Sequence, residues 1–134
     1  MPYWKLYYHL IWATFERCAL IDGNCERVIL LTLHGKAKEL GLTLHAVGSV
    51  QDHIHVVASI PPARSVAECV KGLKGASSRA VNSREATDRA FRWQEGYGAL
   101  SIGERSLATV VGYVKAQKEH HRDGRTIALY EMTT

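Results

Sequence analysis

Short apolar, β-branched runs alternate along the chain with longer segments whose apolar residues recur at helical spacing. Aromatic and β-branched runs indicate strands, because these residues fit a pleated and half-buried surface. Apolar residues every three or four positions indicate amphipathic helices. The pattern predicts strands at residues 3–14, 42–50, 53–60 and 96–102, and helices at residues 25–40, 65–82 and 103–120. Residues 122–134 match neither pattern.

Capping and turn residues set the expected boundaries of these elements. Gly41 follows the last apolar position of the first helix and is expected to end it. Ser65 with Glu68, and Ser101 with Glu104, have the spacing of a capping box, which opens a helix. The remaining breaks are predicted loops at residues 17–24 and 82–89 and a tight turn at Gln51-Asp52.

The order of elements is strand, helix, strand, strand, helix, strand, helix. The first six match the ferredoxin-like βαββαβ arrangement, an antiparallel sheet with helices packed on one face. We therefore predict an α+β fold with one domain over residues 1–134 and an added C-terminal helix. RNA-recognition modules share this outline, so the fold alone does not assign a function.

Composition limits the setting of the protein. No apolar run approaches the ~20 residues that a membrane span needs, and we expect no signal peptide and no membrane partner. The cysteines are odd in number, at positions 18, 25 and 69, and form no Cys-x-x-Cys pair, which favours the reducing cytoplasm. The 17 Lys and Arg outnumber the 13 Asp and Glu, a net charge of +4 that suits a nucleic-acid partner.

His53-Ile54-His55 lies at the start of a predicted strand. Because side chains two apart on a strand point to the same face, both imidazoles are expected side by side. Such a pair is half of a metal site, although a chain with seven histidines can contain one His-x-His by chance.

Tyr113 and Gln117 lie four residues apart on the last predicted helix and therefore share one of its faces. Tyr113 either belongs to the apolar stripe of that helix or serves as a nucleophile. A tyrosine can attack a phosphodiester once a divalent cation polarises the phosphoryl oxygens. Two imidazoles and an amide oxygen are able to hold Mg²⁺ or Mn²⁺ and leave positions open for phosphate.

These motifs resemble a known family. Asp52-His53-Ile54-His55 resembles the His-hydrophobic-His motif of the HUH endonucleases. The segment 113–117, followed by His120-His121, resembles the tyrosine helix of the single-tyrosine transposases of insertion sequences, to which the REP-associated tyrosine transposases are related. Further similar segments lie at residues 11–14, 74–79 and 93–98, so the resemblance spans nearly the whole chain.

The resemblance implies a metal-dependent DNA transposase that nicks and rejoins single-stranded DNA with hairpin ends. It assigns His53, His55 and Gln117 as ligands of Mg²⁺ or Mn²⁺, and Tyr113 as the nucleophile that becomes linked to a DNA 5′-phosphate. It also implies a homodimer in the prokaryotic cytoplasm. The tail after His121 is shorter and less helical than is usual in the family.

Several other side chains are candidate site residues. Three basic residues of the second helix either contact DNA phosphates or form a solvated face: Lys71, Lys74 and Arg79. Three more either support the metal ligands from a second layer or are ordinary turn and helix-end residues: Asp52, His120 and His121.

Two alternative functions remain open at this stage. One is a non-catalytic single-stranded nucleic-acid-binding module of the same fold, for which the strand histidines are an unusual feature. The other is a hydrolytic zinc enzyme that uses His53, His55 and a carboxylate such as Glu119, but the chain lacks a metalloprotease-type motif.

Overall fold

The computed structural model describes residues 3–84, 90–124, 126 and 128–133. Its centre is a four-stranded antiparallel sheet with the order β2-β3-β1-β4. The strands are β1 (Tyr7–Ala13), β2 (Thr43–Val50), β3 (His53–Ser59) and β4 (Gly98–Ile102). This order, with one helix after β1 and another after β3, confirms the predicted ferredoxin-like α+β fold.

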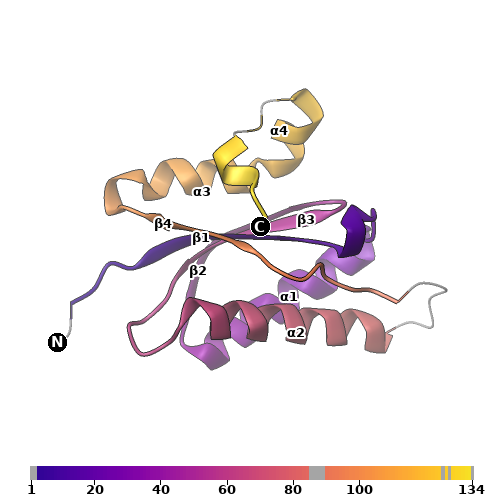
Figure 1. Cartoon of the computed structure of the whole chain (residues 1–134), viewed down its shortest axis with the longest axis horizontal. Coiled ribbons are helices and arrows are strands. Elements are labelled where there is room, and N and C mark those ends of the chain that lie inside the picture. Colours follow the sequence, from indigo (N-terminus) through magenta and orange to yellow (C-terminus); the bar gives the residue numbers. More distant parts are fainter. Residues whose placement is uncertain (1–2, 85–89, 125, 127, 134) are drawn as a thin grey trace.

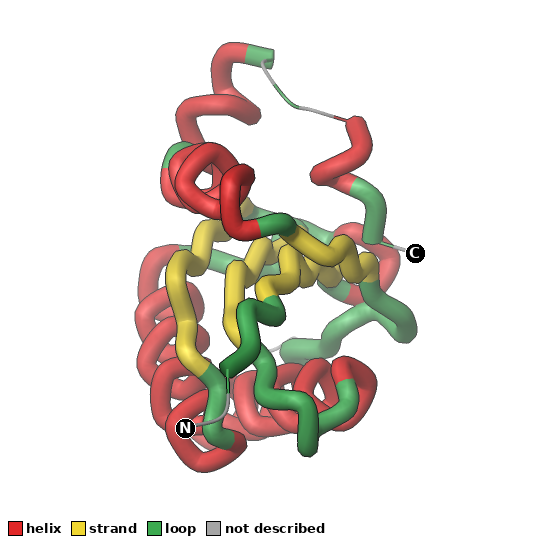
Figure 2. Tube along the Cα trace, turned by 90° about the vertical axis from the view of Figure 1, so that its left-hand side faces the viewer, coloured by secondary structure: helices red, strands yellow, loops and turns green. Residues whose placement is uncertain are grey.

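Helices cover both faces of the sheet (Figure 1). The first two, α1 (Gly23–Leu40) and α2 (Val66–Arg84), pack side by side on one face. The opposite face carries α3 (Leu107–Lys115), α4 (Gln117–Asp123) and a short 3-10 helix, η3 (Ala128–Glu131). Figure 2, turned by 90°, shows the sheet as a middle layer between these two groups of helices. In the described part of the chain, no helix combines the length and apolarity that crossing a bilayer requires.

Strand alternation divides the interior into two cores. On the face toward α1 and α2, Leu10 and Trp12 of β1 meet Ile54 and Val56 of β3, and all four are fully buried. On the other face, Val57 lies in a smaller cluster with residues of α3. Burial on both faces explains why β3 reads as an almost continuous apolar run. It also encloses the two histidines that interrupt this run.

The capping box predicted at the start of α2 is formed in both directions. The Glu68 amide donates to Ser65 Oγ at 3.0 Å, and the Ser65 amide donates to Glu68 Oε1 at 3.2 Å. The first helix begins two residues earlier than predicted, because the Asp22 carboxylate accepts from the Cys25 amide at 2.8 Å and caps it. Gly41 ends this helix, as predicted.

Other predicted boundaries need correction. The first strand begins at Tyr7 and not at residue 3, and β4 begins at Gly98 and not at residue 96. Ser101 lies inside β4 and pairs with Tyr8, so it does not open a helix. The chain instead enters a 3-10 turn at Glu104–Ser106. The single helix predicted at residues 103–120 is broken at Ala116, whose φ of −98° and ψ of 23° separate α3 from α4. Residues 82–84 of the predicted loop continue α2, and residues 85–89 lie outside the described residues.

Candidate metal centre and nucleophile

His53 and His55 project from β3 on the face covered by α3, α4 and η3, as the strand period predicts. Both are buried, with 3% and 0% of their surfaces exposed, and their ring centroids are 5.1 Å apart. Two buried imidazoles at this separation need polar partners, because an unpaired ring nitrogen in the interior is destabilising.

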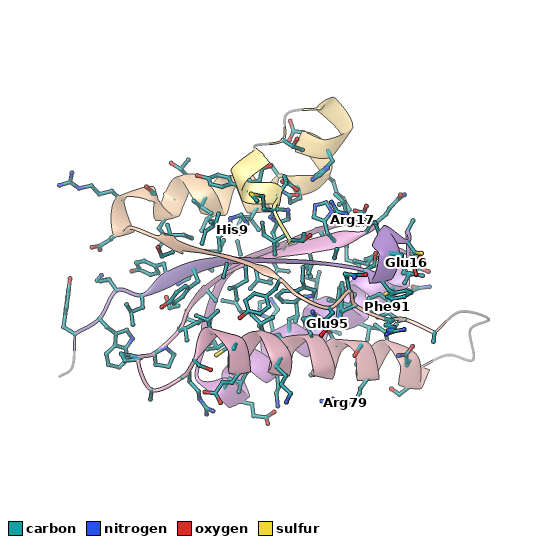
Figure 3. The ribbon with its side chains drawn as sticks, viewed as in Figure 1. His9, Glu16, Arg17, Arg79, Phe91 and Glu95 are labelled. Carbon is teal, nitrogen blue, oxygen red and sulfur yellow. The ribbon has the colours of Figure 1, made fainter. Side chains whose placement is uncertain are left out.

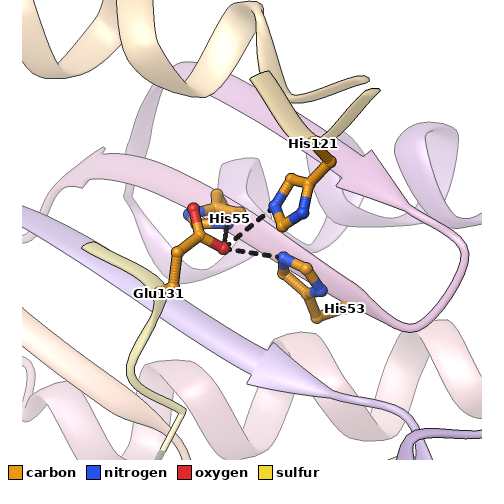
Figure 4. Close-up of side chains that lie close together, drawn as sticks. All are labelled: His53, His55, His121 and Glu131. Carbon is orange, nitrogen blue, oxygen red and sulfur yellow. Dashed lines mark hydrogen bonds and ion pairs between the residues drawn. The ribbon is translucent and has the colours of Figure 1, made fainter. Parts of the chain in front are cut away.

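One carboxylate oxygen supplies that partner (Figure 4). Glu131 Oε1 lies 2.9 Å from His53 Nε2, 3.2 Å from His55 Nε2 and 3.1 Å from His121 Nε2. The three imidazole nitrogens therefore converge on a single position. Ligand atoms of these four residues all lie within 4.8 Å of one another, the spacing of a cluster that can hold a metal ion.

Tyr113 reaches the same carboxylate from α3. Its hydroxyl donates a hydrogen bond to Glu131 Oε2, the oxygen that the histidines do not use. The tyrosine side chain is 6% exposed, and its ring centroid lies 6.1 Å from that of His55. The candidate nucleophile and the histidine pair are thus brought together, and Glu131 bridges them.

The electrostatics of the cluster favour the ionised form of the Glu131 carboxyl. Burial of the Glu131 carboxyl opposes ionisation, but hydrogen bonds from His53, His55 and Tyr113 outweigh it and hold the pKa of Glu131 far below its usual range. Burial lowers the pKa of His55, and hydrogen bonding to Glu131 offsets part of that effect. A neutral imidazole is the form that binds a metal.

A second layer of side chains orients the two strand histidines. Asp52 Oδ1 lies 2.7 Å from His53 Nδ1, where a carboxylate can orient the imidazole ring. His9 of β1 lies with its Nε2 at 2.8 Å from His55 Nδ1, and is itself 1% exposed. Both contacts engage Nδ1 and leave Nε2 toward the cluster.

Gln117 lies at the start of α4, next to Gly48 of β2 and outside the four-residue cluster. It is 1% exposed, and its Nε2 lies 3.5 Å from the Tyr113 carbonyl oxygen. A Cβ atom placed on Gly48 would lie 3.0 Å from Gln117 Cγ, and Gly48 is the residue paired with His55 in the sheet. Gln117 Oε1 has no hydrogen-bond partner among the described residues. A buried acceptor of this kind is available to a cation.

Two glycines flank His55 in the row that crosses the sheet, and each permits a close backbone approach. Gly48 of β2 pairs with His55, and Gly98 of β4 pairs with Ile11, the β1 neighbour of His55. A Cβ atom on Gly48 would come within 1.9 Å of the Val114 carbonyl oxygen, and one on Gly98 within 1.9 Å of the Met132 carbonyl oxygen. Because glycine has no side chain, α3 and the tail can pack directly against the sheet, α3 at Gly48 and the tail at Gly98.

The sequence did not identify Glu131 or His9 as site residues, and it placed His121 only in a supporting role. Nothing local distinguishes Glu131 from the other acidic residues, since its position depends on how the tail folds back. His9 follows the period-two alternation of β1, but only the strand register reveals its contact with His55. The side chain of His120 lies outside the described residues.

The basic residues of α2 lie away from the cluster. Figure 3 shows Arg79 beyond α2, on the opposite side of the sheet from His9. Lys71 and Arg79 are exposed, whereas the Lys74 ammonium donates to the backbone carbonyls of Gln94 at 2.7 Å and Gly96 at 2.9 Å. An open hollow of about 690 Å³ instead adjoins the cluster, and its lining includes the cations of Arg17 and Lys118 together with Asp52 and His121.

The donor set fits a divalent cation. Three imidazole nitrogens and a carboxylate oxygen suit Mn²⁺ or another first-row ion, and additional oxygen donors such as Gln117 Oε1 would improve the fit for Mg²⁺. A cation held there would carry its positive charge beside the Tyr113 hydroxyl, an arrangement suited to reactions of phosphate esters.

Comparisons with known proteins identify the family of the chain. The family model for IS200-like transposases matches residues 2–117. The ISDra2 transposase TnpA of Deinococcus radiodurans is 27% identical over 121 residues, which cover 87% of this chain and 86% of that protein. The transposase of insertion sequence IS200 from Salmonella typhimurium is 26% identical over 132 residues, covering 94% of this chain and 86% of its own.

Solved structures show the same architecture. A crystal structure described as that of a transposase from Deinococcus radiodurans superposes with a TM-score of 0.68 at 28% identity, over 87% of this chain and 95% of its own. A REP-associated tyrosine transposase bound to a REP hairpin gives the same TM-score of 0.68 at 10% identity, over 94% of this chain and 76% of its own. At that low identity the likeness concerns the fold. With a family model covering most of its length, the chain belongs to the IS200-like transposase family.

Proposed function

We propose that this transposase cuts and rejoins single-stranded DNA through a covalent bond between Tyr113 and a DNA 5′-phosphate, with a divalent cation held by His53 and His55. The observation that supports it most directly is the shared carboxylate of Glu131. Its two oxygens contact the Tyr113 hydroxyl and the Nε2 atoms of both histidines, so one small anion reaches the nucleophile and the metal ligands together.

The proposed reaction is a transesterification. The bound cation would supply Lewis-acid polarisation of the scissile phosphate. The Tyr113 oxygen forms a bond to phosphorus while the bond from phosphorus to the 3′ oxygen breaks. The phenolic proton is given up and the departing oxygen takes up a proton, which leaves a free 3′-hydroxyl. Because one phosphoester replaces another, a second strand's 3′-hydroxyl can reverse the step without ATP.

Gln117 is proposed as a further ligand on the strength of its unpartnered oxygen. Its Oε1 is buried and lacks a hydrogen bond within the described part of the chain. Binding to a cation would satisfy this acceptor, whose burial is otherwise unfavourable by about 1–3 kcal/mol. Mg²⁺ or Mn²⁺ is the proposed cofactor, since both accept mixed nitrogen and oxygen ligands and leave positions for phosphate.

Single-stranded DNA with hairpin ends is the proposed substrate. A solved relative of the same fold is named as a REP-associated tyrosine transposase bound to a REP hairpin. In this chain, Arg17 supplies a cation to the open hollow next to His121, while Lys118, in the same lining, is paired with Glu26. A homodimer in the prokaryotic cytoplasm is also proposed, as in the family that the motifs resemble.

The direct test is formation of a covalent protein–DNA adduct. Purified protein is incubated with Mn²⁺ and a hairpin-tipped single strand, and the products are resolved on a denaturing gel. We expect an adduct with the parent protein and none with Tyr113→Phe or His55→Ala. Tyr3→Phe is the matched control, because Tyr3 is 81% exposed and lies far from the site in the sequence. An adduct formed by Tyr113→Phe at the parental rate would refute the proposal.

The same experiment separates the proposal from a non-catalytic binding module. Such a module would bind the strand equally with and without a divalent cation and would form no adduct. Because equal binding by itself does not exclude cleavage, DNA binding and adduct formation are both measured on the same samples.

A further inference from the structure

We infer that Glu131 is a metal ligand of the DNA-free protein and occupies the place of the scissile phosphate, so that DNA must displace it before Tyr113 can react. This inference rests on the proposed function, because it concerns what fills the same site when DNA is absent. Two of the residues it uses, His121 and Glu131, lie beyond the segment that the family model matches, which ends at residue 117.

The carboxylate contacts the candidate metal ligands and the candidate nucleophile at the same time. One oxygen, Oε1, is 2.9–3.2 Å from three imidazole Nε2 atoms, and the other, Oε2, accepts from the Tyr113 hydroxyl. Oε1 lies where the three ring nitrogens converge, so the carboxylate must shift outward to become a ligand when a cation enters. A phosphate poised for attack presents one anionic oxygen to that cation and lies within reach of the tyrosine oxygen. A carboxylate in this position excludes the phosphate, because both cannot occupy it.

His121 strengthens the site as a third nitrogen donor. Together with Glu131 it gives four donors, His53, His55, His121 and Glu131, from a single chain. Four donors of this type close a first-row metal site, whereas His53 and His55 alone leave it open. The DNA-free protein should therefore bind Mn²⁺ more tightly than the histidine pair could.

The tail that carries Glu131 is seated by contacts of its own. The Tyr130 ring packs edge-on against His9 and Tyr113, with ring centroids 5.4 Å and 5.1 Å away. Met132 places its carbonyl oxygen where a Cβ atom on Gly98 would lie, at 1.9 Å. These contacts position Glu131 before any ion binds. A substitution of Gly98 should therefore displace the tail without changing Glu131 itself.

The first test measures Mn²⁺ binding in the absence of DNA, by the electron paramagnetic resonance signal of free Mn²⁺. We expect Glu131→Ala to weaken Mn²⁺ binding by about tenfold or more, and Gly98→Ala to weaken it similarly, because the added methyl displaces Met132. Glu104→Gln is the matched control, since Glu104 pairs with Lys5 at the surface. Parental affinity in Glu131→Ala would overturn the assignment of Glu131 as a ligand.

The second test asks whether DNA displaces the carboxylate. At saturating Mn²⁺, Glu131→Ala and the isosteric Glu131→Gln should bind a hairpin-tipped single strand several-fold more tightly than the parent and form adduct at least as fast. If Glu131→Ala forms adduct more slowly at saturating Mn²⁺, Glu131 stays in place during the reaction and the displacement is refuted. An adduct in Tyr113→Phe would instead refute the proposed function and leave the Mn²⁺ result standing.

Hydrogen exchange of the tail amides tests the displacement of Glu131 independently. The amides of residues 130–133 should exchange faster when the parent binds Mn²⁺ and the DNA strand than with Mn²⁺ alone. Unchanged or slower exchange would contradict displacement. Thermal unfolding shows whether each variant keeps its fold. If Gly98→Ala does not fold, the two Glu131 variants still test the inference.

Discussion

His9 Nε2 and His55 Nδ1 are 2.8 Å apart, and both rings are buried in the sheet face below η3. If His55 is to offer the lone pair of its Nε2 to a cation, its Nδ1 must carry the proton and donate it to His9. His9 therefore acts through His55 as a positioning residue that fixes which nitrogen faces the cluster.

This relationship predicts different outcomes for two substitutions of His9. In His9→Phe the acceptor is lost, and we expect the Mn²⁺ concentration for half-maximal adduct formation to rise about tenfold. In His9→Gln an amide oxygen can accept the same hydrogen bond, so most of the metal affinity should return. Direct Mn²⁺ binding checks both. Equal effects of the two variants would show that His9 merely fills space.

Gly48 should be intolerant of any side chain. In Gly48→Ala the new Cβ would lie 1.9 Å from the Val114 carbonyl oxygen, so α3 must move away from the sheet and carry Tyr113 with it. We expect the free energy of unfolding to fall by about 1–3 kcal/mol and adduct formation to fall more than about tenfold. Chemical denaturation and the gel assay measure the two effects.

Gly35→Ala is the matched control for this substitution. A Cβ on Gly35, inside α1, meets nothing within 4 Å, and alanine favours a helix by about 1 kcal/mol over glycine. Stability should therefore rise or stay unchanged, and activity should persist. Parental activity in Gly48→Ala would show that the approach of α3 to the sheet is unnecessary for the reaction.

Lys74 and Lys71 should behave differently although both were tentative DNA contacts. Lys74 donates to two backbone carbonyls of the segment before β4, and burial lowers its pKa. We expect Lys74→Met to reduce the free energy of unfolding by about 1–3 kcal/mol and to leave the salt dependence of DNA binding unchanged. Lys71→Met should leave stability unchanged. If Lys74→Met lowers the salt slope by about one, Lys74 contacts a phosphate.

The buried His9 gives the metal-free protein a pH-dependent stability. Burial, with a smaller contribution from His55, lowers the pKa of His9 to about 4 from its usual 6.5. The unfolded chain therefore takes up this proton at higher pH than the folded chain. The stabilisation is complete above pH 6.5 and is lost as the pH falls toward 4, at about 1.4 kcal/mol per pKa unit, or about 3 kcal/mol. Denaturation at pH 7 and 4.5 should show a steeper loss for the parent than for His9→Gln.

Tyr113 should serve the histidines of its own chain. It reaches His53 and His55 through Glu131 of the same chain. A mixture of Tyr113→Phe and His55→Ala proteins, unfolded and refolded together, should therefore form no adduct. If the mixture recovers about a quarter or more of the parental activity, the tyrosine acts on a partner's histidines.

The sequence predicted those parts of the site that depend on local periodicity. His53 and His55 share a face because strands repeat every two residues, and Tyr113 points to the sheet because α3 places its apolar stripe there. The capping box of Ser65 and Glu68 formed for the same reason, since its geometry involves four consecutive positions.

The remaining parts depend on contacts between distant segments. The Ser101–Glu104 box failed because β4 pairing with β1 extends the chain through Ser101, and tertiary pairing overrides a local signal. Glu131 was missed because its position is set by the tail folding back onto the sheet beside Gly98, which no periodicity encodes. Gln117 lies one residue beyond the break at Ala116, so its helix face could not be inferred from a continuous helix.

The measurement that tests the central claim most directly is the identity of the modified residue in the covalent adduct. The adduct formed with Mn²⁺ and a hairpin-tipped strand is digested with nuclease and protease, and the nucleotide-bearing peptide is sequenced by mass spectrometry. Tyr130 is the relevant rival, since its ring centroid lies 5.1 Å from that of Tyr113. We predict a 5′-phosphate linked to Tyr113. A nucleotide on Tyr130 or on any other residue would contradict the account.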